Sequence, residues 1–249
     1  MKEKKFALVT GCAKRIGAEL CKVLANNNYN LIIHYNNSEN EAIELKNFIL
    51  QNDPSLEIYL FQCDLTDLEK TQELIEFIKE KCGHLNALIN NASIFTPENF
   101  SENSPEFIIQ NTNIHFTTPL ILSQYLLDSE KNNCEGKILI NMLDVHRLQN
   151  IQHNEIHPYG RYFTHCATKH SLYLINEYLT KEIQKEKLDT KIFGLALGAV
   201  LENKDDIKYF EKLKVTQNDM LNKMDRMRST FDNILKQRDQ LENQIFKIE

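Results

Sequence analysis

The sequence lacks any long run of basic residues. Its 29 lysines and arginines are outnumbered by 35 aspartates and glutamates, which gives a formal net charge of −6 and a pI of about 5.8. A nucleic-acid partner would require clustered positive charge, so we expect none. Long apolar runs are also missing, since none approaches the roughly 18 residues of a membrane-spanning helix. We therefore expect no membrane partner.

Cysteine is present, but not in the close pairs that zinc sites use. The six cysteines form no C-x-x-C motif. This predicts reduced thiols in a cytoplasmic protein and neither a disulfide framework nor a metal site. The basic N-terminus precedes only the short apolar run Phe6–Val9, so we expect no signal peptide. With 249 residues, 42% of them hydrophobic, residues 1–249 are expected to form a single domain.

The stretch Phe6–Gly17, with sequence FALVTGCAKRIG, predicts a phosphate-binding turn. Its apolar beginning is typical of a buried parallel strand, and a helical pattern follows. A strand that turns sharply into a helix leaves the first N–H groups of the helix unpaired, and these attract phosphate. Gly11 permits the tight turn, and Gly17 lets the helix lie close to the strand.

Apolar strand patterns alternate with helix patterns along most of the chain. We expect strands at residues 6–9, 31–33, 58–61, 87–89, 137–142 and 191–196, and helices at 17–27, 39–52, 66–82, 107–129 and 162–185. The alternation predicts an α/β fold, a Rossmann-type doubly wound parallel sheet. Ligands of such sheets lie beyond the carboxyl ends of the strands. The polar residues that end the strands are therefore the candidate site.

Short polar motifs stand at these strand ends. In chain order they are TGCAKRIG at 10–17, HYNNS at 34–38, CDL at 63–65, NNASIF at 90–95, INMLD at 140–144 and a T-K pair at 168–169. These motifs resemble those of the short-chain dehydrogenase/reductase family, and within it they are most similar to the pteridine reductases and the bacterial dihydromonapterin reductases. The resemblance covers about residues 5–203, and the shared order of the motifs makes it specific.

The resemblance implies a nicotinamide dinucleotide cofactor. The implied cofactor-binding residues are Gly11, Arg15, Ile16, Gly17, Asn36, Asn37, Ser38, Asp64, Leu65, Asn91, Ala92, Ser93 and Lys169. NAD-specific sites place an acid at the end of the second strand, where it binds the ribose 2′-hydroxyl. Here Asn36, Asn37 and Ser38 stand at that place, with Arg15 nearby, so a 2′-phosphate would not be repelled. We therefore favour NADP (NADPH).

The catalytic positions depart from the family pattern. The resemblance implies catalytic roles for Asp144, His165 and Lys169, but the family has a tyrosine where His165 stands. Three interpretations stay open. His165 donates the proton, because an ordinary imidazole pKa of about 6.5 suits acid catalysis near neutral pH. Alternatively, Tyr162 or Tyr159 replaces it from the preceding loop, or catalysis has been lost.

The resemblance also implies a small planar substrate. Phe95 matches an aromatic residue that stacks on the pterin ring in pteridine reductases, and Arg15 and Asp144 would border the same substrate. This implies an NADPH-dependent oxidoreductase acting on a dihydropteridine or dihydrofolate-like compound, in a homo-oligomer (dimer or tetramer). One alternative is a catalytically impaired dinucleotide-binding or scaffold protein of the same fold. Another is a reductase of a different carbonyl, such as 3-oxoacyl-carrier protein.

A second departure lies in the long helix expected at 107–129, which we expect to bend near Pro119. When this helix is aligned on Pro119, His115 takes the place of an asparagine that holds a proton-relay water in the family. We expect His115 either to bind such a water or to be a partly buried structural histidine.

The part that departs most is the C-terminal region, residues 202–249. Met220, Met227 and Ile234 recur there every seven residues. This spacing predicts a helix with one apolar face, which packs on the core or binds a partner. The final stretch, Gln244–Glu249, alternates between polar and apolar residues and fits the last strand equally well.

Overall fold

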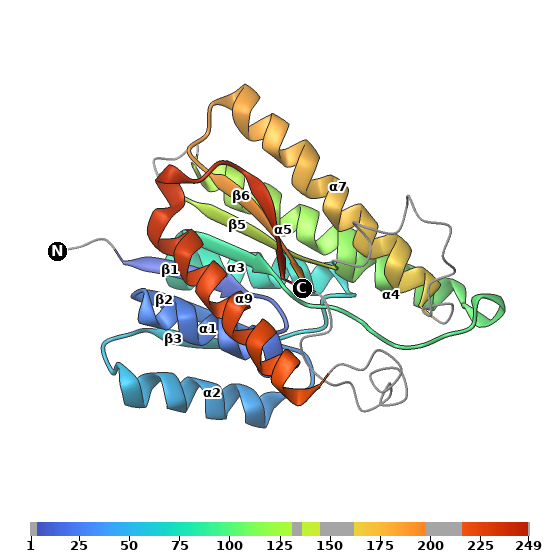
Figure 1. Ribbon diagram of the computed structural model, residues 1–249, viewed down its shortest axis with the longest axis horizontal. Helices are drawn as coiled ribbons and strands as arrows, with labels where there is room; N and C mark the ends of the chain where they lie inside the picture. The colour runs from blue at the N-terminus through green and yellow to red at the C-terminus, as the bar shows by residue number, and fades with distance from the viewer. Residues whose placement is uncertain (1–3, 131–135, 145–161, 198–215, 249) are drawn as a thin grey trace.

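The computed structural model describes residues 4–130, 136–144, 162–197 and 216–248. In these ranges, seven parallel strands form one sheet in the order β3-β2-β1-β4-β5-β6-β7 (Figure 1). The strands are β1 (Lys5–Val9), β2 (Tyr29–Tyr35), β3 (Ile58–Gln62), β4 (Ala87–Asn90), β5 (Ile138–Asp144), β6 (Lys191–Leu197) and β7 (Gln244–Ile248). The predicted Rossmann-type doubly wound sheet is confirmed.

Helices cover both faces of the sheet. They are α1 (Arg15–Asn26), α2 (Glu39–Asn52), α3 (Leu68–Cys82), α4 (Pro105–Thr112), α5 (Thr118–Glu130), α7 (Phe163–Glu186) and α9 (Gln217–Gln237), with short 3-10 turns η1 (Phe100–Glu102) and η4 (Arg238–Gln240). One face packs against α1, α2 and α9, and the other against α3, α5 and α7 (Figure 1).

The two-sided burial explains the apolar strand sequences. Along β1, Ala7 and Val9 belong to one core layer, and Phe6 and Leu8 belong to the other. A strand covered on both faces cannot alternate between polar and apolar residues, and β2 is accordingly buried over its whole length. The strand order reverses between β1 and β4. A crevice at the carboxyl ends of these two strands is the usual ligand position in such a sheet.

The long helix expected at 107–129 is interrupted. It consists of α4, a π-helical segment η2 (Asn113–Thr117) and α5. Pro119 offers no N–H to the carbonyl of His115, four residues earlier, and its ring crowds that carbonyl. The wider π turn accommodates this conflict, and π segments are frequent at functional sites. It places the His115 side chain in the interior, where its exposed fraction is 0%.

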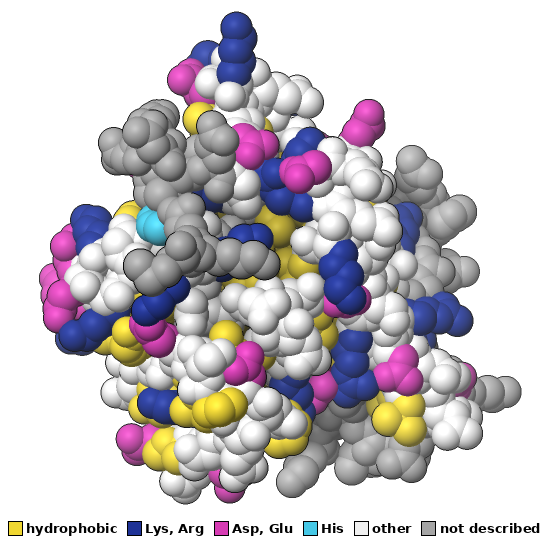
Figure 2. Space-filling view, turned by 90° about the vertical axis from the view of Figure 1, so that its left-hand side faces the viewer, with side chains coloured by type: hydrophobic (Ala, Val, Ile, Leu, Met, Phe, Trp, Pro, Cys, Tyr) yellow, Lys and Arg dark blue, Asp and Glu magenta, His cyan; other side chains and the backbone are white. Residues whose placement is uncertain are grey.

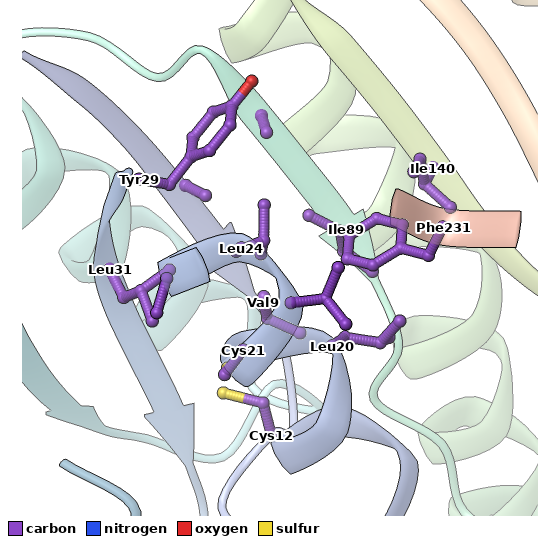
Figure 3. Packing of buried hydrophobic residues seen from close by; sticks show 14 of the residues in the cluster. Val9, Cys12, Leu20, Cys21, Leu24, Tyr29, Leu31, Ile89, Ile140 and Phe231 are labelled. Atoms are coloured by element: carbon purple, nitrogen blue, oxygen red, sulfur yellow. The ribbon is translucent and has the colours of Figure 1, made fainter. Parts of the chain in front are cut away.

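Residues 216–248 complete both the core and the sheet. Helix α9 begins with a capping box between Thr216 and Asp219 and packs across α1. Figure 3 shows the Phe231 ring of α9 beside Leu20 and Ile89, and the exposed fraction of Phe231 is 0%. The apolar helix face therefore packs on the core. The alternating run that begins at Gln244 forms β7, the last strand.

Charges on the described surface are mixed. Figure 2 views the side of the molecule on which the N-terminus lies in Figure 1, and basic and acidic side chains are interspersed there. Many ion pairs join residues of the same helix, such as Lys79 with Glu76 at 2.8 Å and Lys236 with Asp232 at 2.7 Å. Exposed pairs of this kind contribute about 0–1 kcal/mol each, so the core carries most of the stability. Among the described helices, none has the length and hydropathy needed to cross a membrane.

The packing of α9 is tested by two substitutions on that helix. Phe231→Ala removes a fully buried ring and is expected to lower the free energy of unfolding by about 3–5 kcal/mol in urea denaturation. The matched control, Leu221→Ala, changes a side chain that is 59% exposed and is expected to cost less than about 0.5 kcal/mol. Equal, small effects would contradict an integral C-terminal helix.

Candidate cofactor and catalytic site

The turn that follows β1 is tied to the residues that follow β4. The Thr10 hydroxyl oxygen accepts hydrogen bonds from the backbone N–H groups of Asn91 (2.9 Å) and Ala92 (3.0 Å). The Asn91 side-chain amide donates in turn to the carbonyls of Thr10 (2.8 Å) and Gly11 (3.0 Å). Asn91, which the resemblance assigns to the cofactor path, thus holds the turn in place.

Two glycines permit this close approach. Gly11 has a φ of 60°, and a Cβ atom at this position would lie 2.9 Å from the Ala92 Cα. A Cβ atom on Gly17 would lie 2.5 Å from the Cys12 Cα and 2.8 Å from the Asn91 amide nitrogen. Both positions therefore exclude a side chain, in agreement with the tight turn and the close helix packing inferred from the sequence.

Helix α1 begins at this turn with an open N-terminus. Its N-cap residue, Lys14, makes no side-chain capping bond, and the first turn contains no acid. The first N–H groups of the helix are therefore available to an anion. Arg15 is exposed and has a φ of 57°, a conformation that costs about 1–2 kcal/mol for a residue with a side chain. Arg15 and Ile16 thus stand at a helix end suited to phosphate, where a guanidinium adds bidentate hydrogen bonds.

A cleft of about 260 Å³ lies beside the turn. It is lined by Gly11, His34, Asn36, Asp64, Leu65, Thr66, Ala92, Ser93, Ile94, Gln110 and Ile114. The lining includes residues that follow β1, β3 and β4 together with the end of β2, as the predicted cofactor site requires. Asn37 and Ser38 lie just beyond Asn36, at the start of α2, and outside the lining.

Helix α7 holds His165 and Lys169 one turn apart, and both side chains are buried. The Lys169 Nζ donates to the Met142 carbonyl on β5 at 2.9 Å. Burial lowers the pKa of Lys169 to about 8, and the nearby Asp144 carboxylate at the end of β5 opposes the shift. Lys169 is therefore positively charged at neutral pH. Of the three predicted catalytic residues, Lys169 thus lies near Asp144, and His165 lies one turn from Lys169 on α7.

The His165 ring is fixed by the backbone. Its Nδ1 atom lies 2.8 Å from the Ile94 carbonyl oxygen. A carbonyl only accepts hydrogen bonds, so Nδ1 carries a proton and Nε2 is the nitrogen that can exchange one. The ring meets Phe95 edge-on, with centroids 4.8 Å apart, and His115 edge-on at 5.0 Å.

His115 is held as a neutral imidazole. Its Nδ1 lies 2.8 Å from the Thr168 hydroxyl, and its Nε2 lies 2.8 Å from the Ser93 hydroxyl. The Thr168 hydroxyl donates to the Thr164 carbonyl at 2.8 Å, so it accepts from His115 Nδ1–H, and Ser93 donates to Nε2. Burial lowers the pKa of His115 well below its usual value, and the charge of Lys169 adds to the effect. His115 is thus a structural histidine with both ring nitrogens engaged.

Phe95, the predicted substrate-stacking residue, stacks on Tyr162. The two ring centroids are 4.3 Å apart, with 10° between the planes. Tyr162 is the N-cap residue of α7 and is buried. One of the two tyrosines considered as a substitute acid therefore lies in the site. Tyr159 lies outside the described residues.

Sequence reasoning missed several polar residues of the site. Asn90, Asn141 and Asn176 form a buried chain in which the Asn90 amide donates to Asn141 at 2.9 Å and the Asn141 amide donates to Asn176 at 3.2 Å. Asn90 and Asn141 lie inside the quoted motifs, and Asn90 ends β4, so the motifs themselves were a usable signal. The partners of Thr168 and His34 depend on tertiary contacts that no local pattern reveals.

Comparison with known proteins identifies the family of this chain. The sequence profile of the short chain dehydrogenases matches residues 5–202, and the chain therefore belongs to that family, as the motifs predicted. The (S)-acetoin-forming diacetyl reductase of Staphylococcus epidermidis is 26% identical, over 85% of this chain and 79% of its own length. The (-)-isopiperitenone reductase of Mentha piperita is 36% identical, but the match spans 36% of this chain and only 29% of that protein.

A solved structure shares the fold over nearly the whole chain. It is FolM alternative dihydrofolate reductase 1 from Brucella canis, complexed with NADP, with a TM-score of 0.77 and 22% identity. The superposition covers 100% of this chain and 94% of that chain.

The hydrogen bonds of His115 can be tested on α7. Thr168→Val keeps the side-chain shape but leaves a buried imidazole N–H without its acceptor, so it is expected to lower the free energy of unfolding by about 1–3 kcal/mol. Thr180→Val on the same helix removes a hydroxyl that donates only to the Asn176 carbonyl and is expected to cost about 0.5 kcal/mol or less. Urea denaturation compares them, and equal losses would contradict the hydrogen bond between His115 and Thr168.

Proposed function

We propose that this chain is an NADPH-dependent oxidoreductase that reduces a planar, pterin-like substrate, with His165 as the proton donor. The observation that carries the proposal is the contact of the His165 ring with Phe95 at 4.8 Å, one helical turn from the buried Lys169. The family membership supplies the reaction class, a hydride transfer.

The cofactor assignment rests on the cleft and on the open end of α1. The 260 Å³ cleft beside Gly11 and Asp64 suits the adenosine half of a dinucleotide, and the first turn of α1 suits its pyrophosphate. Burial raises the pKa of Tyr35, the last residue of β2, and the Glu39 carboxylate in the first turn of α2 adds to the effect. The residue that follows β2 is Asn36 rather than an acid, so Asn36 and Arg15 would meet the 2′-phosphate. The NADP complex of the Brucella neighbour supports this choice.

The proton would come from His165. Bound NADPH would supply the hydride. Because Nδ1 of His165 is held by the Ile94 carbonyl, the proton leaves from Nε2, and the backbone bond keeps the ring from turning. The neutral His115 ring meets His165 edge-on and adds no like charge when His165 is protonated.

Lys169 and Asp144 would set the charge of the site. Lys169 is positively charged below about pH 8. A buried cation attracts the anionic phosphates of a dinucleotide and can donate hydrogen bonds to its hydroxyls. Asp144 balances that charge at the end of β5 and can accept hydrogen bonds from an amino-substituted ring.

The substrate assignment rests on Phe95. Its stacked partner in this structure is the Tyr162 ring, at 4.3 Å and 10°, which is the geometry that a flat heterocycle would adopt. We infer that a pterin would take the place of the Tyr162 ring. The name of the Brucella neighbour, an alternative dihydrofolate reductase, supports this substrate class.

A second candidate is a dinucleotide-binding protein that has lost catalysis. It is favoured by the same contact, because Tyr162 covers Phe95, and by the bond from Lys169 to the Met142 carbonyl. In this case the chain would bind NADPH without turning over a substrate.

The role of His165 is tested by following NADPH oxidation in the presence of dihydrobiopterin. His165→Gln is expected to lower kcat by about 100-fold or more, because proton transfer by a positioned acid contributes at least that much. The control, His170→Gln, changes a residue on the same helix that stacks on Tyr173, and no change in kcat is expected. Wild-type inactivity combined with turnover by His165→Tyr would establish the second candidate instead.

The role of Tyr162 is tested by Tyr162→Ala in the same assay. If the substrate displaces the ring, its loss should lower KM by about tenfold, since an aromatic pair is worth about 0.5–1.5 kcal/mol. Phe163→Ala, at the next position, changes a ring that is 54% exposed and should leave KM unchanged. A collapse of kcat in Tyr162→Ala would instead identify Tyr162 as the proton donor.

A further inference from the structure

His34 joins the ends of three strands at the cleft. It lies on β2 and is only 2% exposed. The Gly11 N–H donates to its Nδ1 at 2.9 Å, and its Nε2 lies 3.1 Å from the Cys63 carbonyl oxygen after β3. The Cys12 N–H donates to the His34 carbonyl at 2.9 Å. Both the side chain and the main chain of His34 therefore hold the turn that follows β1.

These contacts define one protonation state. The Cys63 carbonyl only accepts, so Nε2 carries a proton, and the Gly11 N–H only donates, so Nδ1 carries none. Only the neutral Nε2–H imidazole satisfies both partners. A second proton would sit on Nδ1 and face the Gly11 N–H, so that the turn would have to move.

We propose that His34 is a positioning residue for the dinucleotide cofactor, and that its neutral imidazole sets the cofactor-binding turn through the hydrogen bond from Gly11. The proposal rests on the cofactor site proposed above. Gly11 and His34 line the same cleft as Asp64. The hydrogen bond to His34 holds Gly11 at its φ of 60°. Because the Gly11 N–H is already bound to His34, the N–H groups of the first turn of α1 would bind the phosphate.

The surroundings of His34 make the neutral state persist. Burial lowers the pKa of His34 to about 4, and the Cys63 backbone and the Asp64 charge oppose the shift only in part. The titratable groups packed near it are Asp64 and Cys63 after β3 and Cys12 after β1. Burial also raises the pKa of Cys63 to about 12, so that thiol stays uncharged. Asp64 is then the charged neighbour among the described residues.

The sign of the pH dependence follows from the lowered pKa. In the unfolded chain His34 has an ordinary histidine pKa of about 6.5. Between about pH 4 and 6.5 the unfolded chain therefore binds a proton at His34 that the folded chain does not bind. The stabilising contribution is present in full above pH 6.5 and is lost as the pH falls toward 4. A variant without a titrating group at this position should lose this part of the pH dependence of unfolding.

Two amide variants separate positioning from simple packing. His34→Asn keeps an acceptor near the position of Nδ1, and His34→Gln places its amide near the position of Nε2. Isothermal titration with NADPH at pH 7 is expected to show His34→Asn within about threefold of wild type and His34→Gln weakened by about tenfold, the equivalent of one hydrogen bond. Urea unfolding from pH 4 to 7 is expected to show a smaller pH dependence in both variants. The control is His84→Gln. His84 precedes the amino end of β4, whereas the cleft lies beyond the carboxyl ends of the strands, so this variant should bind NADPH like wild type.

The outcomes are distinct. If both variants bind NADPH like wild type, or if their affinities follow only their losses of stability, His34 does not position the turn and the proposal fails while the cofactor site stands. If wild-type protein does not bind NADPH, the cofactor site fails and the role of His34 fails with it.

Discussion

The contact between the turn after β1 and the chain after β4 is the constraint on which the carboxyl edge of the sheet depends. Across this contact, the Thr10 hydroxyl oxygen accepts hydrogen bonds from two backbone N–H groups. At Gly11 and Gly17, where the segments approach most closely, there is no room for a side chain. This contact sets the direction of α1, whose open N-terminus suits phosphate. It also fixes the start of the segment that carries Ser93, Ile94 and Phe95 into the site. The residues predicted to bind the cofactor and the substrate are therefore held by the same set of contacts.

Buried histidines hold the rest of the site, and their protonation states follow from their partners. His34 and His115 each bond through both ring nitrogens, and burial lowers the pKa of each. His165 differs, because its Nδ1 is bound to a carbonyl and its position matches that of the family's proton donor. Because His115 is neutral, it places no second positive charge beside Lys169.

Much of this fold could be predicted from local patterns, because parallel strands buried on both faces have apolar sequences and the motifs stand where those strands end. The regions of β6 and α7 were anticipated for that reason. A bend near Pro119 was expected, but the π-helical form of the break at Asn113–Thr117 was not, since it depends on how the chain relieves the conflict at Pro119. The stacking of Tyr162 on Phe95 joins residues far apart in sequence. Nor could the tautomers of His34 and His115 be predicted, because they depend on partners from other elements. A homo-oligomer stays a prediction.

The central claim is that this edge of the sheet forms a dinucleotide site that prefers a 2′-phosphate. Titration of the wild-type chain followed by nicotinamide fluorescence tests it most directly, and the absence of tryptophan simplifies the signal. The account predicts saturable binding of one NADPH per chain, with NADH about tenfold weaker, as expected when one charge-assisted contact is lost. The claim would be contradicted if neither dinucleotide bound, or if NADH bound more tightly than NADPH.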